Sequence, residues 1–408
     1  MPATHAVSRA FLSALRAHRP RRPPPAPTLT PAYRHRRLIS AQAIILPPLL
    51  FAGLVVSLWV QKCIALVLFQ NRIIYMPGMP PNSSLETIAD YQARCRGIRW
   101  REEKIRARDG KHLFLCVAQV DSQRPRAVAT KQPPRKQVHV YILYFQGNAG
   151  SSPPRLPDLS AILAALEQTR AGVDVRFTLA ALSYRGYWKS SGRPHEAGLN
   201  MDAEAAYAWL LATHHAATPK ALDPTSSTSS TPPPPTIVLW GHSIGAAIAT
   251  NLASSASTRR LPPAHQPALL LLETPFLSTR AMLAALYPQK WLPYKHLWPF
   301  ICNPLDTWGN IGVVGRGGKG RVLVDAEMKK QQPRVPPRVA IVQAAEDELV
   351  PAAHPEELEK RCRELGIEVS RTLVARAFHN EASVKPQGRL AIVAALRGVA
   401  ETADRSKE

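Results

Sequence analysis

The sequence predicts an α/β fold: a mostly parallel sheet flanked by helices, with a membrane-spanning helix in front of it. Three observations lead to this prediction. Short apolar runs with the character of buried strands alternate with stretches of helical periodicity. One apolar run ends in a Gly-x-Ser-x-Gly turn followed by a small-residue helix. A long uncharged segment lies ahead of all of them.

The first 40 residues are predicted to be a basic, disordered tail. They contain no acidic residue, and their Pro/Arg-rich stretch RPRRPPPAP cannot form a packed core. The formal net charge of the whole chain is +23, which would suit nucleic acid or an anionic membrane surface. No zinc-finger spacing, RNA-binding aromatic motif or helix-turn-helix pattern accompanies the charge. We therefore expect a membrane partner and no nucleic acid.

Residues 41–69 are predicted to be a transmembrane anchor. No charged residue occurs from Leu38 to Gln61, and a helix from Pro48 to Phe69 is long enough to cross a bilayer. Lys62 is the exception within this stretch. It either snorkels toward the headgroups or marks the end of a span that began earlier. The alternative interpretation of the segment is a buried core helix.

The arginines that precede the anchor predict which membrane face carries each end of the chain. By the positive-inside rule the N-terminus is cytoplasmic and the catalytic domain lumenal. We expect a single-pass protein of the endoplasmic reticulum or another endomembrane. The Arg-rich, acid-free start also resembles a mitochondrial transit peptide, so a mitochondrial membrane is the alternative. The five cysteines are scattered without a C-x-x-C pair, which argues against a disulfide scaffold and a zinc site.

A globular domain is expected over residues 85–402, beyond a Pro/Gly/Asn turn that follows the anchor. Asp109-Gly110 is a hairpin signal between two early strands. The strands expected after it are 138–145, 173–182, 237–240, 268–272, 339–343 and 368–374. The helices expected between and after them include 156–168, 356–365 and 390–402, together with a long one after the loop SYRGYWKSSGRPHE. Polar, Pro-rich or Gly/basic composition predicts loop insertions near 121–137, 221–235 and 309–335.

The stretch TIVLWGHSIGAAIATNLAS predicts a nucleophile elbow at Ser243. A serine on a sharp strand-to-helix turn needs neighbours without side chains, which Gly241 and Gly245 provide. The helix that follows directs its positive N-terminal end at the serine. A simple Gly/Ser loop is the other interpretation, but the apolar strand before the turn and the Ala-rich helix after it favour the elbow.

A serine nucleophile needs a base and an acid that orients the base. In α/β-hydrolases the chain order is Ser, then Asp or Glu, then His, and both partners follow strands. Asp347 in QAAEDELVP and His379 in ARAFHNEAS fit this order. Glu346 is the alternative acid. His242 is expected to point away from the site, although it is adjacent to the nucleophile, and His354 is expected to start a helix.

The oxyanion hole is predicted from two backbone N–H groups. One belongs to Ile244, directly after the nucleophile. The other comes from the Gly147–Gly150 loop, where Asn148 is the expected donor with Gln146 and Ala149 nearby. A phosphate-binding loop is disfavoured because no G-K-[ST] follows. No metal ligands cluster in the sequence, so we expect metal-free acyl transfer to water with no cofactor.

Several segments in order resemble the membrane-anchored α/β-hydrolases called bud-emergence-46-like, which include animal α/β-hydrolase domain-containing proteins thirteen and seventeen. They are FQNRIIYMP, GNAGSS, YRGYWKSSGRPHEAGLNMDAEAA, VLWGHSIGAAIA, LLETPFLST, AEDELVP and AFHN. The resemblance covers roughly residues 65–400. It implies an α/β-hydrolase fold with Ser243, Asp347 and His379 as triad. The family usually has His where Gln146 stands here, which is a departure in the oxyanion loop.

These observations predict a membrane-anchored serine hydrolase that cleaves a carboxylic ester or acyl thioester of a lipid or an acylated protein. The aromatic-rich segment 276–308 is expected to form an apolar wall for an acyl chain, or simply to pack the domain. Two other classes remain open. One is a catalytically inactive membrane-bound scaffold with the same fold, which the intact triad disfavours. The other is a peptidase of the prolyl-oligopeptidase type, disfavoured because no propeller-sized domain precedes the hydrolase.

Overall fold

The computed structural model describes residues 40–122, 137–168, 174–217, 234–316 and 335–405. By its internal contacts the chain divides into two units, Met1–Val56 and Ser57–Glu408. Helix α1 (Ala41–Leu68) begins in the first unit and ends in the second, and none of its residues is buried. Its length and apolar composition make it a candidate membrane span. Pro47 and Pro48 lie inside the helix, so it begins earlier than the expected Pro48.

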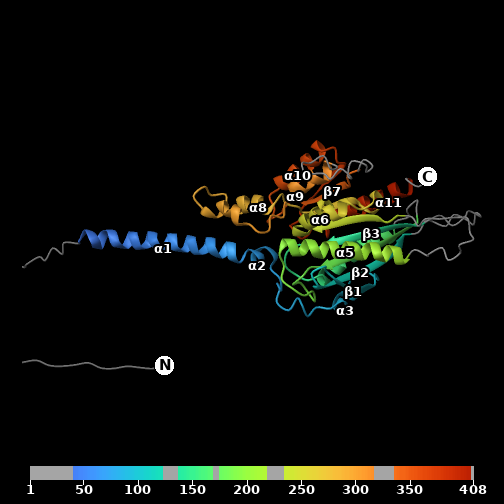
Figure 1. Cartoon of the computed structure of the whole chain (residues 1–408), viewed down its shortest axis with the longest axis horizontal. Helices are drawn as coiled ribbons and strands as arrows, with labels where there is room; N and C mark the ends of the chain where they lie inside the picture. The colour runs from blue at the N-terminus through green and yellow to red at the C-terminus, as the bar shows by residue number, and fades with distance from the viewer. Residues whose placement is uncertain (1–39, 123–136, 169–173, 218–233, 317–334, 406–408) are drawn as a thin grey trace, which may run out of the picture. The chain divides into compact units, whose positions relative to one another are not determined.

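The second unit is built on an eight-stranded sheet in the order β1-β2-β4-β3-β5-β6-β7-β8 (Figure 1). Strands β1 and β2 form an antiparallel hairpin, β2 pairs antiparallel with β4, and all later pairs are parallel. The strands are β1 (Trp100–Arg106), β2 (His112–Ser122), β3 (Val138–Phe145), β4 (Val175–Ser183), β5 (Thr236–His242), β6 (Pro267–Glu273), β7 (Arg338–Ala344) and β8 (Val369–Val374). This is the α/β-hydrolase fold, as the sequence predicts.

Helices cover both faces of the sheet because its central strands are apolar on both sides. All seven residues of β5 are buried, and only one residue of β3 is not. One core lies under α5 (Glu196–Ala217), α6 (Ile244–Ser254), α9 (Thr307–Gly315) and α10 (Ala353–Glu364). The other lies under α4 (Leu156–Gln168) and α11 (Pro386–Arg405), with α3 (Ile88–Gln92) nearby. Short helices complete the list: η1 (Pro153–Arg155), α7 (Ala256–Arg259) and η2 (Pro263–His265).

Two details of the expected boundaries differ in the structure. Helix α2 (Gln70–Tyr75) lies between the anchor and the expected Pro/Gly/Asn turn, and turns follow it at residues 77–78 and 81–85. The side chain of Tyr75 is fully buried, and its hydroxyl donates to Asn303 Oδ1 at 3.1 Å. The packed domain therefore begins before residue 85. Likewise, residues 307–315 are not part of a loop insertion, because they form helix α9, which buries Ile311 and Val314.

The remaining parts of the expected loop insertions fall mostly outside the described residues. These parts are 123–136, 218–233 and 317–334. At the edge of the first segment, Asp121 and Ser122 complete strand β2.

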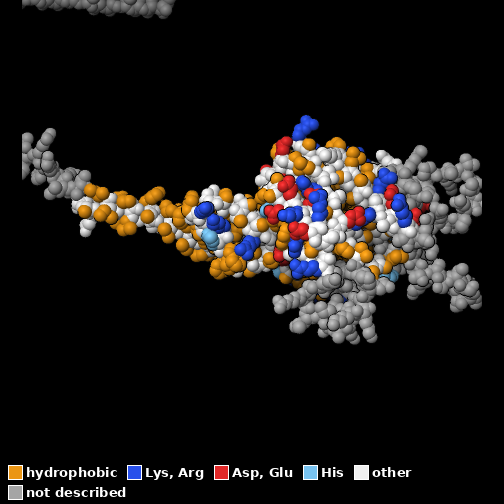
Figure 2. All heavy atoms as spheres, turned by 90° about the horizontal axis from the view of Figure 1, so that it is seen from above, with side chains coloured by type: hydrophobic (Ala, Val, Ile, Leu, Met, Phe, Trp, Pro, Cys, Tyr) orange, Lys and Arg blue, Asp and Glu red, His pale blue; other side chains and the backbone are white. Residues whose placement is uncertain are grey.

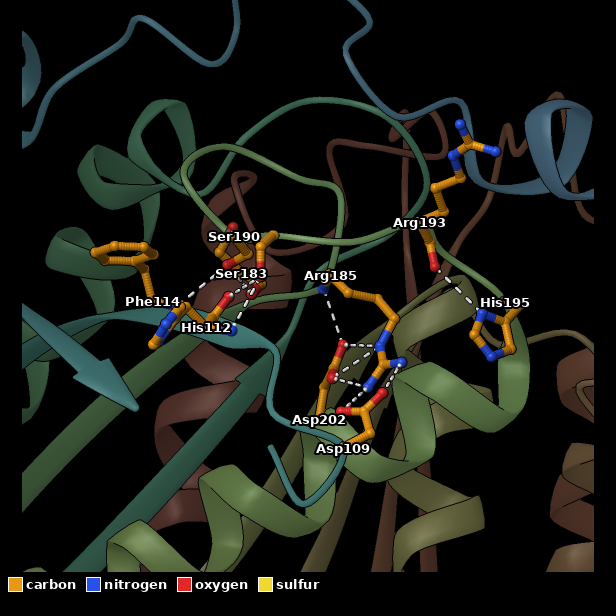
Figure 3. A network of polar contacts seen from close by, with 10 residues as sticks. Asp109, His112, Phe114, Ser183, Arg185, Ser190, Arg193, His195 and Asp202 are labelled. Carbon is orange, nitrogen blue, oxygen red and sulfur yellow. Dashed lines mark hydrogen bonds and ion pairs between the residues drawn. The ribbon is translucent and has the colours of Figure 1, made fainter. Parts of the chain in front are cut away.

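A buried arginine in the loop after β4, Arg185, joins this loop to the β1–β2 turn and to helix α5 (Figure 3). Arg185 Nη2 donates to Asp202 Oδ1 of α5 at 2.7 Å, and its Nη1 donates to Asp109 Oδ2 in the β1–β2 turn at 2.8 Å. Asp202 also accepts from the Arg185 backbone N–H at 2.8 Å. Because both carboxylates and the guanidinium are mutually satisfied, the cluster holds three chain segments together. It fixes the loop from which Tyr184 and Tyr187 extend.

A separate layer, which we call the cap, consists of residues 274–305. It contains α8 (Thr279–Leu286) and the 3₁₀ helix η3 (Pro293–Phe300). Ser278 begins α8 by accepting a hydrogen bond from the Ala281 N–H at 3.1 Å. Of the residues in α8 and η3, only Tyr294 is buried. The cap follows β6, so it lies at the end of the sheet where the strands' carboxyl ends meet.

Candidate active site

Ser243 occupies a strained turn between β5 and α6. Its φ of 54° and ψ of −116° lie outside the regions that L-residues ordinarily adopt. Its N–H donates to the carbonyl of Glu273 at the end of β6, at 2.8 Å. A Cβ atom on Gly241 would lie 2.2 Å from the Gly245 carbonyl oxygen, and one on Gly245 would lie 2.0 Å from the Phe145 carbonyl oxygen. Only glycine fits at both positions, which explains the Gly-x-Ser-x-Gly pattern.

His379 and Asp347 are brought together by the loops after β8 and β7. His379 Nδ1 lies 2.9 Å from each carboxylate oxygen of Asp347. Asp347 Oδ1 also accepts from the N–H groups of Leu349 and Val350, at 3.0 and 2.8 Å. The neighbouring Glu348 accepts from the backbone N–H of His379 at 2.9 Å. Of the acids weighed from the sequence, Asp347 is the one that contacts the imidazole.

Ser243 and His379 line the same cavity, but no hydrogen bond joins them. In the described part of the chain, His379 Nε2 is buried and has no hydrogen-bond partner. This nitrogen is the one that would receive a proton from the serine. A long or unaligned nucleophile–base contact is common without substrate and tightens in the complex. The side chains of His379 and Asp347 are therefore joined, and Ser243 lies on the same cavity as His379.

The β3–η1 loop is attached to the segment after the anchor helix. Ala149 has φ of 58° and Gly150 has φ of 75°, so both lie in the left-handed region. Ala149 N–H donates to the Tyr75 carbonyl at 3.1 Å, and Gly150 N–H donates to the Met79 carbonyl. Tyr187 O–H donates to the same Tyr75 carbonyl. Both amides after Asn148 are thereby occupied.

Asn148 and Ile244 face the same cavity as Ser243. Ile244 is the first residue of α6, so its N–H has no carbonyl four residues earlier within that helix. Since the amides of Ala149 and Gly150 are already bonded, Ala149 is no longer a candidate oxyanion donor. The two amides predicted from the sequence, those of Asn148 and Ile244, belong to residues that line the cavity.

Gln146 stands where the family usually has His, and it forms buried hydrogen bonds at the start of this loop. It is buried, and its carbonyl accepts from the Tyr184 hydroxyl at 3.2 Å. Its side-chain Oε1 accepts from Ser152 Oγ, also at 3.2 Å. The departure from the family pattern thus changes a buried contact at the base of the loop.

His242 does not point away from the site, contrary to the expectation from sequence. Its Nε2 lies 3.3 Å from the His379 carbonyl oxygen, and the two rings lie 5.3 Å apart. A Cβ atom on Gly147 would come within 2.8 Å of His242 Nδ1. Burial, together with the nearby charges of Arg155 and His379, holds the pKa of His242 well below its usual range. A neutral imidazole therefore packs between the oxyanion loop and the loop of the base. No sequence signal distinguished it from a surface histidine.

The cavity above Ser243 has a volume of about 300 Å³ and is predominantly apolar. Its floor is formed by Ser243, His379, Asn148 and Ile244. One wall comes from the end of α1 and from α2: Leu66, Val67, Gln70, Ile73 and Ile74. A second wall comes from the cap and includes Phe276, Met282, Leu283, Leu286, Tyr287, Leu297, Phe300 and Ile301. The aromatic-rich segment thus supplies an apolar wall, one of the two roles expected for it.

The end of the anchor helix is fastened to the cap by aromatic contacts. Lys62 Nζ lies 4.4 Å from the ring centre of Tyr294 and 5.2 Å from that of Tyr287. Trp59 lies 5.5 Å from Trp291, ring centre to ring centre. A lysine over two aromatic faces is a favourable cation–π arrangement. Lys62, the one charged residue within the predicted span, therefore contacts two aromatic side chains of the cap.

Within the described ranges, no group of three or more His, Cys, Asp or Glu side chains is arranged to hold a metal ion. The five cysteines, all of which the structure describes, are free thiols.

Comparison with known proteins relates the chain to α/β-hydrolases. It is 31% identical to protein bem46 of Schizosaccharomyces pombe over 220 residues, which cover 54% of this chain and 58% of that protein. It is 30% identical to lysophosphatidylserine lipase ABHD12 of Mus musculus over 143 residues, covering 35% of this chain and 28% of that protein. The chain thus spans less than two thirds of either relative. No family model matches it.

Among solved structures, an α/β-hydrolase from Vibrio vulnificus matches 81% of this chain and 92% of its own, with a TM-score of 0.49 and 16% identity.

Proposed function

Because this chain is an α/β-hydrolase homologous to bem46 and ABHD12, we propose that it is a membrane-anchored serine hydrolase that cleaves a carboxylic ester or acyl thioester. The observation that carries the proposal is the hydrogen-bonded pair of Asp347 and His379 beside the strained Ser243. Buried acid, imidazole and serine, converging from three loops on one apolar cavity, are the constellation of an acyl-transfer enzyme.

In the proposed reaction His379 Nε2 removes the proton of Ser243 Oγ as that oxygen attacks the acyl carbonyl. Asp347 accepts from Nδ1–H, holds the tautomer and stabilises the imidazolium that forms. His379 then gives its proton to the leaving alcohol or thiol, and the C–O or C–S bond breaks. Water attacks the resulting acyl-enzyme with His379 again as base, which releases the acid and regenerates Ser243.

The oxyanion of each tetrahedral intermediate is assigned to the N–H groups of Asn148 and Ile244. Both residues line the cavity beside Ser243, and Ile244 lies at the positive end of α6. The hydrogen bonds from Ala149 to Tyr75 at the end of α2, and from Gly150 to Met79 beyond it, would keep the loop in this conformation. Two fixed donors stabilise developing charge without reorganisation, and removing one such donor typically costs about 10²–10³-fold in kcat.

An acyl group of a lipid or of an acylated protein is the substrate class that we propose. The cavity is walled by aliphatic and aromatic side chains, which suit a hydrocarbon chain better than a peptide or a sugar. The name of ABHD12, a lysophosphatidylserine lipase, favours the lipid. The candidate span α1 would tether the enzyme to the membrane that holds this substrate. An endoplasmic-reticulum or other endomembrane location with a lumenal catalytic domain remains our proposal.

Ester and thioester hydrolysis by the full chain in detergent or lipid tests this function. The substrates are matched oxygen esters and thioesters with short and long acyl chains. We expect hydrolysis by the native chain and at least a 10³-fold loss with Ser243→Ala. Ser257→Ala, at an exposed position of the short helix α7, is the control and keeps full activity. A folded native chain inactive toward every ester would instead support the scaffold.

A further inference from the structure

Two segments that are far apart in the sequence share an unusual charge pattern. The cap, residues 274–305, contains no Asp or Glu but carries Arg280, Lys290 and Lys295. Residues 57–85 comprise the end of α1, helix α2 and the segment after it. They also lack acidic residues and carry Lys62 and Arg72. On the face seen in Figure 2, basic and acidic side chains of the domain lie interspersed. A basic, acid-free surface is complementary to anionic lipid headgroups.

The cap also exposes large apolar side chains next to these cations. Trp291 is 65% exposed, Leu286 61%, Phe300 59% and Trp298 46%. The Arg280 guanidinium lies 4.2 Å from the ring centre of Trp298. Four exposed large apolar side chains within one short segment are more than scattered surface residues require. Tryptophan and arginine beside aliphatic residues are typical of surfaces that enter the headgroup region of a bilayer.

The cap is joined to the part of α1 that would leave the membrane. The uncharged part of α1, Ala41 to Gln61, extends roughly 30 Å at 1.5 Å per residue, which matches the hydrocarbon core of a bilayer. Lys62 is the first charged residue after it, and it contacts the rings of Tyr287 and Tyr294 in the cap. Gln70 holds the other end of the cap by donating to the Phe300 carbonyl at 3.1 Å. The cap is therefore held at the level where the span ends.

The cavity is lined by apolar residues between the end of α1 and Ser243. Leu66 and Val67, one turn beyond Lys62, form one wall. Met282 and Leu286 of α8 belong to the other wall, and Ser243 lies at the floor. An acyl chain entering between α1 and α8 would contact hydrocarbon on both sides. It would not have to cross water on its way to the serine.

On these grounds, and resting on the proposed function, we infer that the cap is a bilayer-docking surface. Its exposed tryptophans and cations sit in the headgroup layer of the membrane that holds α1. The acyl chain of the substrate then passes directly from that bilayer between α1 and α8 to Ser243. The substrate class is thus narrowed to acyl chains already resident in the membrane.

Photocross-linking of the full chain in vesicles tests the docking without relying on activity. The photoreactive amino acid p-benzoylphenylalanine replaces Trp291 or Trp298, and the vesicles contain phosphatidylcholine and phosphatidylserine with radiolabelled acyl chains. The control is the same replacement at Leu390, which is 68% exposed on α11, away from the cap. We expect labelled lipid on both cap positions and none at residue 390. Equal labelling at all three positions, no lipid at the cap, or a cross-linked pair of chains instead of lipid would each overturn the inference.

A second measurement compares two substrates with the double variant Trp291→Glu/Trp298→Glu, whose residues do not line the cavity. One substrate is a short-chain ester dissolved in water and the other a long-chain ester embedded in vesicles. We expect hydrolysis of the embedded ester to fall about tenfold while the dissolved ester is unaffected. An equal loss on both, or no loss on either, would contradict delivery from the bilayer. If the native chain cleaves neither substrate, the proposed function fails, whereas the cross-linking result still decides the docking surface.

Discussion

The nucleophile elbow and the cap are built on opposite principles. At the elbow, backbone atoms approach so closely that Gly241 and Gly245 admit no side chain, and every strand residue around them is buried. In the cap, only Tyr294 of the residues in its two helices is buried, and large apolar side chains face outward. Under the proposed function, this difference means that the fold fixes the position of the reacting atoms. The cap, whose surface can vary without disturbing the sheet, would then select the substrate.

The largest effect is expected from the acid that orients the base. With Asp347→Asn, His379 loses its carboxylate partner, and kcat should fall about 10³–10⁴-fold while the protein stays folded. Glu346→Gln, which changes the exposed neighbouring carboxylate, should leave kcat within about twofold of native. Steady-state kinetics with a short-chain ester compares the two. A greater loss with Glu346→Gln would move the acid to that residue.

Because the elbow is tightly packed, replacing glycine by alanine should change the free energy of unfolding differently at two helical positions. Gly245→Ala places a Cβ atom 2.0 Å from the Phe145 carbonyl oxygen, so it should destabilise the fold by about 3 kcal/mol or more. Gly398→Ala meets nothing within 4 Å in α11 and should stabilise by about 0.5–1 kcal/mol. Denaturant unfolding measures both. Similar stabilities for the two variants would remove the distinction drawn here.

The adaptability of the cap predicts a change in selectivity without loss of chemistry. Met282→Trp narrows the cavity, so kcat/KM for a long-chain ester should fall about tenfold relative to that for an acetate ester. Ala284→Trp, on an exposed part of the same helix, is the matched control and should leave the ratio unchanged. Assays over a series of chain lengths read out the preference. A uniform loss on all esters would indicate damage to the elbow instead.

The smallest effect concerns the buried neutral His242. Its folded pKa is lowered, so below about pH 6.5 the unfolded chain takes up a proton that the folded chain does not. The free energy of unfolding therefore decreases as pH falls, by up to about 1.4 kcal/mol per pH unit from this residue. His242→Asn should make the dependence shallower by that amount than in the native chain. Thermal unfolding between pH 7 and 5 compares them, and parallel curves would refute the assignment.

Most of the fold could be predicted from sequence patterns, because each buried strand is a continuous apolar run with a turn signal after it. The helices 156–168 and the hairpin at Asp109-Gly110 occur as predicted. The resemblance to the bem46-like hydrolases is likewise confirmed by the relatives found. For the site, the pairing of Asp347 with His379 could be predicted because both follow strands, and their side chains are in contact in the structure. Their catalytic roles stay a prediction.

What the sequence left open depends on contacts between distant segments. Tyr75 reads as part of a turn, yet it is buried because Asn303 and Tyr187 bond to it from loops far along the chain. His242 is indistinguishable by composition from a surface histidine, and only packing against His379 places it at the site. Helix α9 was not predicted, because its glycines are typical of a loop. They are tolerated in the helix because Gly312 and Gly315 pack against α10 and the residues after it. Such pairings have no local signature.

Labelling with a fluorophosphonate probe, followed by mapping of the modified peptide, tests the central claim most directly. The probe reacts with a serine only when base and oxyanion hole are assembled around it. We predict that the folded full chain is labelled on Ser243 alone, and that labelling disappears with Ser243→Ala and slows strongly with Asp347→Asn. A folded, membrane-inserted chain that takes no label, or takes it on another serine, would contradict the assignment of Ser243, Asp347 and His379 as a catalytic triad.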